Sequence, residues 1–303
     1  LNNFKKSAII ERQLNKDLSV FGIKDINEVA EVLGYASQNT IQGAISYFAS
    51  YTDWCIDQGL RGENENGVND FTIFLSTQDT SKFVSKLKAK HRYLTKDEVY
   101  DAVDRLVNYT DKALVLALYE GIGGEKLHEI RSLKRDIIND DSFINNNIVK
   151  LEDMNGNIRT KGISNKLKYI LKYASSQDEY IPGNGQSNAK TKMYYLTQTD
   201  YIIRIIAGTN NKNDSDMVEY PSLIQKIVTL KKYIGYNFIT AKSLEDSGAI
   251  NRILELTKEH GLKEPNNDIF SLLKEVNEYN YSDMQIYNLK QKYYLVTEIK
   301  RFD

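Results

Sequence analysis

Cysteine, histidine and proline are scarce in this chain of 303 residues, and each scarcity excludes a class of site. The one cysteine, Cys55, cannot form an internal disulfide, and no Cys/His cluster has the spacing of metal ligands. We therefore expect a cytoplasmic protein without a metal or other cofactor. None of the three histidines, His91, His128 and His260, has a nucleophile or a carboxylate at a spacing typical of a hydrolase.

Long apolar runs and an excess of one charge are also missing. The longest apolar run, residues 113–119, is far shorter than the ~20 residues of a membrane span, and the first residues lack the apolar core of a signal peptide. Forty basic and forty-one acidic residues give a net charge of −1. This balance argues against indiscriminate coating of nucleic acid, which needs a basic face. It is compatible with a DNA-binding protein whose charges are sorted by face.

Helical periodicity dominates the N-terminal third of the chain. From Ser37 to Cys55, apolar residues recur on one helical face, with Ser37 and Asn39 as candidate N-caps and Gly59 as a plausible end. Together with shorter helices, this pattern predicts an all-helical unit. The shorter helices are expected at residues 26–33, 68–75 and 83–87.

A change of composition marks a domain boundary. Five basic residues and no acid lie between Ser81 and Arg92, and Thr95 and Glu98 then form a capping box that begins a new helix. We therefore expect an N-terminal domain, a basic linker and a larger C-terminal domain. Their predicted bounds are residues 1–80, 81–94 and 95–303.

The C-terminal part combines helices with one hairpin. The stretch EGIGGEKLHEIRSLKRDI, residues 120–137, reads as a glycine-rich turn followed by an amphipathic helix. β-type residues on either side of Asn155 and Gly156 predict a hairpin, so a small antiparallel sheet interrupts the helices. The other helices are expected at residues 96–107, 111–119, 165–174, 222–233, 243–260, 268–279 and 282–300.

This succession of segments resembles the tyrosine recombinase, or phage integrase, family over nearly the whole chain. The resemblance implies a mostly α fold, with a helical core-binding (SAM-like) domain followed by a recombinase-like domain of helices and a small antiparallel sheet. In that family, two arginines and a His or Trp hold the scissile phosphate. A hairpin lysine protonates the leaving oxygen, and a tyrosine attacks phosphorus.

The family's catalytic residues carry over poorly to this chain. A lysine lacks the bidentate fork of an arginine, and a carboxylate repels the phosphate, so the resemblance implies a degenerate pocket and no enzyme activity. Tyr287 matches the nucleophile position and is expected to be vestigial. By this resemblance, Lys126 stands at the first arginine and Met154 at the hairpin lysine. Lys242 and Glu245 stand at the histidine and the arginine of the family's His-x-x-Arg motif, so Glu245 is at the second arginine, and Glu278 stands at the later His or Trp.

Within the family, the chain is most similar to the integrase-like master repressors of SPbeta-type Bacillus phages. That resemblance implies a repressor that maintains lysogeny from the host cytoplasm and nucleoid by binding operator sites on double-stranded DNA. Phage lysogeny-control proteins of the arbitrium type are its implied partners, and self-association is left open. The candidate DNA contacts are Asn39, Thr40, Lys86, Lys88, Lys90, Arg92, Lys126, Arg131, Lys134, Arg159, Lys161, Lys226, Lys231 and Lys242.

Two alternatives remain open. The chain is an active, divergent recombinase if Arg131 is the first arginine in a shifted register and Arg252 replaces the second. It is an architectural protein if it bridges DNA sites without sequence preference. The degenerate-site interpretation predicts that four residues converge on one pocket, namely Lys126, Lys242, Glu245 and Tyr287.

Overall fold

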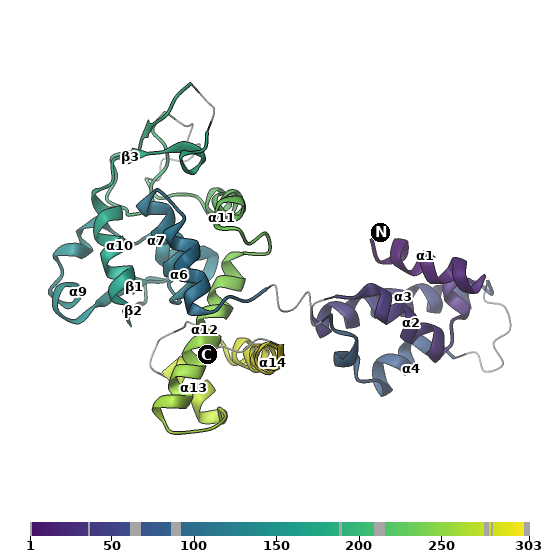
Figure 1. Cartoon of the computed structure of the whole chain (residues 1–303). Helices are drawn as coiled ribbons and strands as arrows, with labels where there is room; N and C mark the ends of the chain where they lie inside the picture. The colour runs from purple at the N-terminus through teal and green to yellow at the C-terminus, as the bar shows by residue number, and fades with distance from the viewer. Residues whose placement is uncertain are drawn as a thin grey trace. The chain divides into compact units, whose positions relative to one another are not determined.

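The chain divides into two compact units, residues 1–91 and 92–303 (Figure 1). The computed structural model describes residues 2–35, 37–60, 68–85, 92–187, 190–208, 216–275, 279 and 281–299. The division between the units falls inside the segment expected to be a linker, and the exact bounds at residues 80 and 95 stay predictions.

The N-terminal unit is helical, as predicted. Ile41, Ile45 and Phe48 are fully buried on one face of its longest helix. The Ser37 side chain accepts a hydrogen bond from the Thr40 amide, so Ser37 is the N-cap and the other candidate, Asn39, lies inside the helix. The helix expected at residues 83–87 is not found in its described part: Phe83 is the last residue of a short 3-10 helix, and residues 84 and 85 are not helical. Residues 86 and 87 lie outside the described part. The elements are α1 (Asn2–Leu14), η1 (Leu18–Val20), α2 (Ile23–Leu33), α3 (Gln38–Asp57), α4 (Asp70–Thr77) and η2 (Thr80–Phe83).

The C-terminal unit begins at the predicted capping box. The Glu98 amide donates to the Thr95 hydroxyl, and the Glu98 carboxylate accepts from the Thr95 amide at 2.8 Å. The elements that follow are α6 (Lys96–Asp104), α7 (Tyr109–Tyr119), η3 (Glu125–Leu127), α8 (His128–Arg131), η4 (Arg135–Asn139), α9 (Asp141–Asn146), β1 (Ile148–Glu152), β2 (Ile158–Gly162), α10 (Asn165–Ser176), β3 (Glu179–Tyr180), η5 (Pro182–Gly185), β4 (Tyr194–Tyr195), α11 (Tyr220–Ile234), α12 (Ala241–Glu259), α13 (Asn267–Glu275) and α14 (Asp283–Ile299).

The predicted hairpin is present. Strands β1 and β2 pair antiparallel, with Ile148 opposite Gly162 and Glu152 opposite Ile158. Gly156 adopts a φ of 82° in the connecting turn, a conformation that costs glycine little. A second antiparallel pair joins the two-residue strands β3 and β4, in a part of the chain where the sequence pattern predicts no strand.

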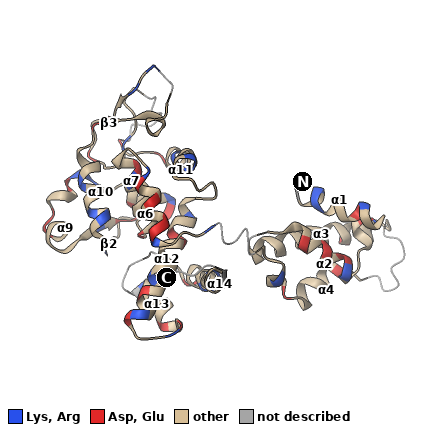
Figure 2. Cartoon of the chain, in the orientation of Figure 1, with Lys and Arg blue, Asp and Glu red and all other residues tan. Residues whose placement is uncertain are grey.

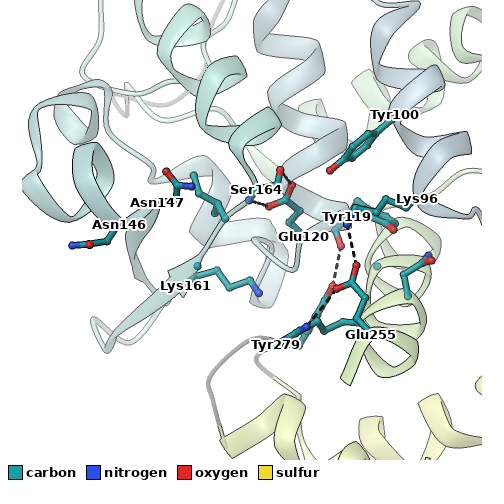
Figure 3. Close-up of a pocket in the computed structure, with 15 residues that line it drawn as sticks. Lys96, Tyr100, Tyr119, Glu120, Asn146, Asn147, Lys161, Ser164, Glu255 and Tyr279 are labelled. Carbon is teal, nitrogen blue, oxygen red and sulfur yellow. Dashed lines mark hydrogen bonds and ion pairs between the residues drawn. The ribbon is translucent and has the colours of Figure 1, made fainter. Parts of the chain in front are cut away.

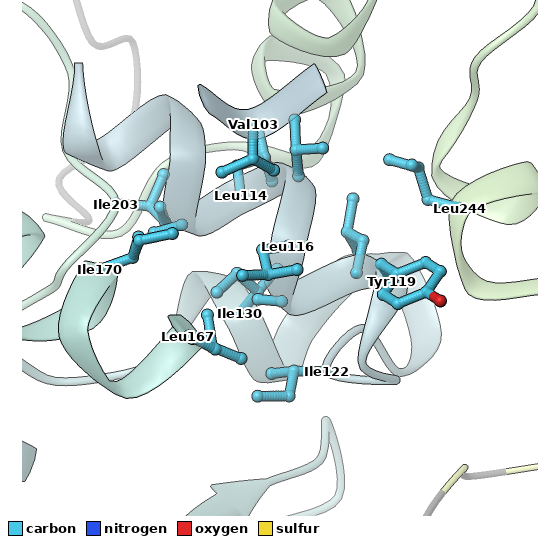
Figure 4. Close-up of a cluster of buried hydrophobic side chains, with 14 of the residues drawn as sticks. Val103, Leu114, Leu116, Tyr119, Ile122, Ile130, Leu167, Ile170, Ile203 and Leu244 are labelled. Atoms are coloured by element: carbon cyan, nitrogen blue, oxygen red, sulfur yellow. The ribbon is translucent and has the colours of Figure 1, made fainter. Parts of the chain in front are cut away.

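Helix α7 is the centre of the C-terminal core. Residues 113–119, the longest apolar run of the sequence, are all buried there, and α7 packs against α6, α10 and α12. Figure 4 shows Leu114 and Leu116 of this helix among side chains that come from distant segments, including Leu167 and Ile203. The run is therefore a core helix. Among the described residues, no helix is both long and apolar enough to cross a membrane.

Helices α7 and α12 approach each other unusually closely at Gly248. A Cβ atom added there would lie 1.6 Å from the carbonyl oxygen of Tyr119. The same oxygen accepts a hydrogen bond of 3.0 Å from the Tyr279 hydroxyl. Only glycine fits this crossing, which fixes α12 against the C-terminal end of α7 and so positions the residues at the start of α12.

Candidate functional site

The prediction of a single amphipathic helix after the glycine-rich turn is wrong. Residues 120–137 form a short 3-10 turn, the one-turn helix α8 and a second 3-10 segment. Lys126 and Leu127 have φ angles of 48° and 55°, in the left-handed region, so the backbone at these two residues cannot continue a right-handed helix. The apolar periodicity was informative about burial, since Leu127, Ile130 and Leu133 are all buried. Lys126 is exposed at the tip of the turn.

A buried ion pair holds this turn against the hairpin. The Nε and Nη2 atoms of Arg159 on β2 donate to the two carboxylate oxygens of Glu129, at 2.6 and 2.7 Å. Glu129 also accepts from the Gly123 amide at 3.0 Å, and Arg159 donates to the Gly121 carbonyl at 2.7 Å. The side chain of Glu129 is fully buried, and that of Arg159 is 11% exposed. Arg159 therefore fixes the turn against β2. A phosphate would have to compete with Glu129 for the Arg159 guanidinium.

Glu245, near the start of α12, packs on the same turn. Its Oε1 atom lies 2.1 Å from the position that a Cβ at Gly123 would occupy. Burial raises the pKa of Glu245 to about 7, with Asp246 and Glu129 acting in the same direction and Lys242 against it. A carboxylate thus occupies the space between the glycine-rich turn and α12.

The charges around Glu245 are compensated within the fold. The Lys242 amine lies 3.4 Å from Glu245 and 3.3 Å from Asp246, and the Lys292 amine of α14 lies 2.5 Å from Asp246. Lys242 also sits over the ring of Tyr281, 4.4 Å from its centroid. The structure therefore brings Lys242 and Glu245 to the turn that carries Lys126.

Tyr287 lies on α14, which the ion pair between Lys292 and Asp246 ties to α12. Its side chain is 59% exposed. Met154, at the position of the hairpin lysine, is exposed beside the β1–β2 turn. Glu278 lies outside the described residues. Whether Tyr287 joins the other three candidates in one pocket stays a prediction.

The other candidate DNA contacts fall into four groups. Asn39, Thr40, Arg92, Lys126 and Lys134 are exposed. Lys86, Lys88 and Lys90 lie outside the described residues. Figure 2 shows basic residues along α10 and α11 interspersed with acidic ones on neighbouring elements such as α6. Lys231 is half-buried. The side chains that the fold already engages or buries are those of Arg131, Arg159, Lys161, Lys226 and Lys242.

The first alternative needs two arginines that the fold uses otherwise. The Nε atom of Arg131 donates to the Val218 carbonyl at 2.6 Å. Arg252 lies seven residues beyond Glu245, about 10 Å along α12, and pairs with Glu259 at 2.8 Å. The geometry therefore gives this assignment no support.

We expect Glu245→Gln to stabilise the protein increasingly as the pH rises. The folded carboxyl keeps its proton up to about pH 7, whereas in the unfolded chain it ionises near 4.5, so stability is lost as the pH rises through this window. The advantage of the glutamine variant should grow by about 2–3 kcal/mol between pH 5 and pH 8. Urea unfolding at both pH values measures it.

The matched control is Glu152→Gln, at an exposed position on β1. It should change the free energy of unfolding by less than about 0.5 kcal/mol at either pH. An equal effect of Glu245→Gln at pH 5 and pH 8 would contradict the buried, proton-retaining carboxyl.

Comparison with known proteins covers both units. The family model described as "MrpR, C-terminal catalytic domain" matches residues 93–302, and "MrpR, N-terminal core-binding domain" matches residues 1–58. The chain is 26% identical over 260 residues to "SPbeta prophage-derived uncharacterized protein YopR" of Bacillus subtilis (strain 168), with 86% of this chain and 77% of that protein covered. The solved structure "Integrase from mycobacterium phage Brujita" has 12% identity and a TM-score of 0.39, with 100% of this chain and 85% of that chain covered. The chain belongs to the MrpR family, which has the core-binding and catalytic domains of tyrosine recombinases.

Proposed function

We propose that the chain is a sequence-specific DNA-binding repressor that keeps the recombinase fold without its strand-cleaving chemistry. The observation that carries this proposal is the position of Glu245 against the glycine-rich turn at Gly123. By the motif alignment, this residue replaces the family's second arginine. Phosphoryl transfer spreads negative charge over the phosphate oxygens, and a carboxyl group at that position, protonated or ionised, supplies none of the positive charge that an arginine would.

The cations around Glu245 do not make up for the missing arginine. Lys242 pairs with Glu245 and Asp246, and Arg159 pairs with Glu129. Each of these charges therefore already has a carboxylate partner. Removing one transition-state donor typically lowers the rate about a hundredfold or more, and the proposal requires that several are gone.

Binding to DNA needs less than cleavage. A lysine can hold a phosphate as a point charge without the bidentate geometry of an arginine. Lys126 is exposed on the strained turn and has no ion-pair partner among the described residues. Lys134 is also exposed, and Asn39 and Thr40 are exposed at the start of α3. We assign these residues to the duplex backbone.

Repression is the biological role that we attach to this binding. The core-binding and catalytic domains support binding to DNA, and the SPbeta prophage-derived relative supports an origin in a prophage. The role that we propose beyond this is that of a phage regulator that occupies operator sites on double-stranded DNA in the host cytoplasm. Lysogeny-control proteins of the phage would then be its partners. This role predicts binding to a defined sequence.

Selection from a random DNA pool tests the sequence preference. Repression predicts enrichment of one motif, bound at least ~10³-fold more tightly than random DNA of equal length at the same salt concentration. Recovery without an enriched motif would contradict repression and favour the architectural alternative.

Lys126→Ala and Lys134→Ala should each weaken binding to the selected motif and to random DNA by similar factors. Both lysines are assigned to phosphates, which carry no sequence information. Each substitution should also reduce the slope of log K against log salt by about 1. Fluorescence anisotropy over a salt series measures both quantities.

The control for these variants is Lys274→Ala on α13, an exposed lysine that pairs with Asp283 at 2.7 Å. It should leave affinity and salt slope unchanged. If Lys126→Ala and Lys134→Ala both behave like this control, the assignment of the turn to the DNA interface is wrong.

A further inference from the structure

Three tyrosines gather on one exposed face of the C-terminal unit. Tyr169 and Tyr173 lie one turn apart on α10, and Tyr109 is the first residue of α7. The ring centroids of Tyr169 and Tyr173 are 4.5 Å apart, and those of Tyr109 and Tyr173 are 4.9 Å apart. Tyr169 and Tyr173 nevertheless stay 53% and 43% exposed. Exposed, mutually packed tyrosines are typical of the centre of a protein–protein interface.

Helix α10 brings positive charge to this face. It carries three lysines and no acid. The fold already uses two of them, since Lys166 donates to Asp104 and Lys168 donates to Asn147. The third, Lys172, is exposed and has no ion-pair partner among the described residues. Lys172 is therefore the cation of α10 that is available to another molecule.

Helix α6 brings negative charge. Its nine residues include four acids and one lysine, and acidic residues mark α6 in Figure 2. The lysine, Lys96, is compensated, because its amine lies 3.0 Å from Glu255 of α12 in a polar cleft of the C-terminal unit (Figure 3). Asp97 and Asp101 are exposed, and neither has an ion-pair partner in the part of the chain that the structure describes. The outer side of α6 is therefore acidic.

The two helices and the tyrosines form one continuous face. The Lys166 amine of α10 lies 2.8 Å from Asp104 of α6 and 4.4 Å from the centre of the Tyr100 ring. Helix α7, which begins at Tyr109, packs against both α6 and α10 (Figure 1). We call this surface, formed by α6, α10 and the three tyrosines, the tyrosine face. It is basic along α10 and acidic along α6.

We propose that the tyrosine face pairs with the same face of a second copy of the chain in a two-fold symmetric dimer. In such a contact a surface meets itself, so it must be complementary to itself. With the axis at the tyrosines, α10 of each copy lies over α6 of the other, and Lys172 faces the acids of its partner. The tyrosine rings then pack in the centre. A duplex does not fit this face, because the α6 carboxylates repel phosphates.

Sedimentation velocity of the full chain without DNA, over a series of protein concentrations, tests the proposal. We expect a dimer whose fraction rises with concentration. Tyr169→Ala should raise the dissociation constant of the dimer at least about tenfold, because two rings leave the centre of the interface. Tyr47→Ala is the matched control, since Tyr47 is a 66% exposed helical tyrosine of the N-terminal unit. It should leave the dissociation constant unchanged.

Charge reversal tests which helices meet. Lys172→Glu and Asp101→Lys should each raise the dissociation constant at least about tenfold, because each creates two contacts between like charges in a dimer. An equimolar mixture of the two variants should associate about as strongly as the wild type. In the mixed dimer every altered side chain faces the opposite charge, so only this pairing of α10 with α6 predicts the recovery.

The proposal is overturned if the wild type stays monomeric at every concentration. It is also overturned if a folded Tyr169→Ala protein dimerises like the wild type, or if the mixture associates no better than either charge variant alone. Thermal unfolding scans establish that the variants are folded. The proposal goes beyond DNA binding, and since DNA is absent from these experiments, no outcome bears on repression.

Discussion

Gly248→Ala is expected to destabilise the C-terminal unit by at least about 3 kcal/mol. The added methyl group would lie 1.6 Å from the Tyr119 carbonyl oxygen and 2.8 Å from the Tyr279 hydroxyl. A backbone oxygen cannot rotate out of the way like a side chain, so α7 and α12 must move apart, and both are packed in the core. Overpacking of an ordinary core position typically costs about 1–3 kcal/mol, and this contact is closer than such positions allow.

Urea unfolding followed by far-ultraviolet circular dichroism measures the loss. Trp54, the single tryptophan, lies in the N-terminal unit, so its fluorescence follows that unit separately. The Trp54 transition should stay at the same urea concentration in Gly248→Ala, while the transition of the C-terminal unit shifts to lower urea.

Gly43→Ala is the matched control. Gly43 lies in α3, is exposed, and has no atom within 4 Å of an added Cβ. Alanine is the better helix former by about 1 kcal/mol, so this variant should stabilise the N-terminal unit. A Gly248→Ala protein as stable as the wild type would show that the two helices are farther apart than described.

Arg159→Ala should lower the free energy of unfolding by about 3–5 kcal/mol. It leaves the Glu129 carboxylate buried with the Gly123 amide as its remaining partner, and breaking one side of a buried pair typically has this effect. It also removes the hydrogen bond to the Gly121 carbonyl. The glycine-rich turn and the hairpin should loosen together.

Lys150→Ala on the neighbouring strand is the control for the buried pair. Lys150 lies 2.8 Å from Asp140, but its side chain is 58% exposed, so its loss should cost less than about 1 kcal/mol. Urea unfolding of both variants under identical conditions gives the comparison. An Arg159→Ala variant that loses no more than Lys150→Ala would mean that water already screens the Arg159–Glu129 pair.

Local signals in the sequence predicted much of the fold. The Ser37 cap, the box of Thr95 with Glu98, and the hairpin turn at Gly156 depend on residues within a few positions of each other, and the structure contains all three. The two-residue strands β3 and β4 lack such a signal, because two residues are too few for a period.

The site was predictable only in part. Motif spacing placed Lys126 and Glu245 as candidates, and helical spacing is compatible with the pair of Lys242 and Glu245. The pair of Glu129 with Arg159 joins residues thirty positions apart, and complementary charge alone does not identify it among forty basic residues. The same applies to the left-handed turn at Lys126, which tertiary contacts impose against the helical period.

Covalent trapping tests the central claim most directly. A nicked duplex that carries the selected motif traps an active tyrosine recombinase as a protein–DNA adduct, because the leaving fragment diffuses away. We predict that the wild-type protein shifts this duplex in a native gel but gives no adduct in a denaturing gel, and that Tyr287→Phe behaves identically. An adduct that forms with the wild type and disappears in Tyr287→Phe would contradict the account, since it would show that Tyr287 attacks phosphorus despite Glu245.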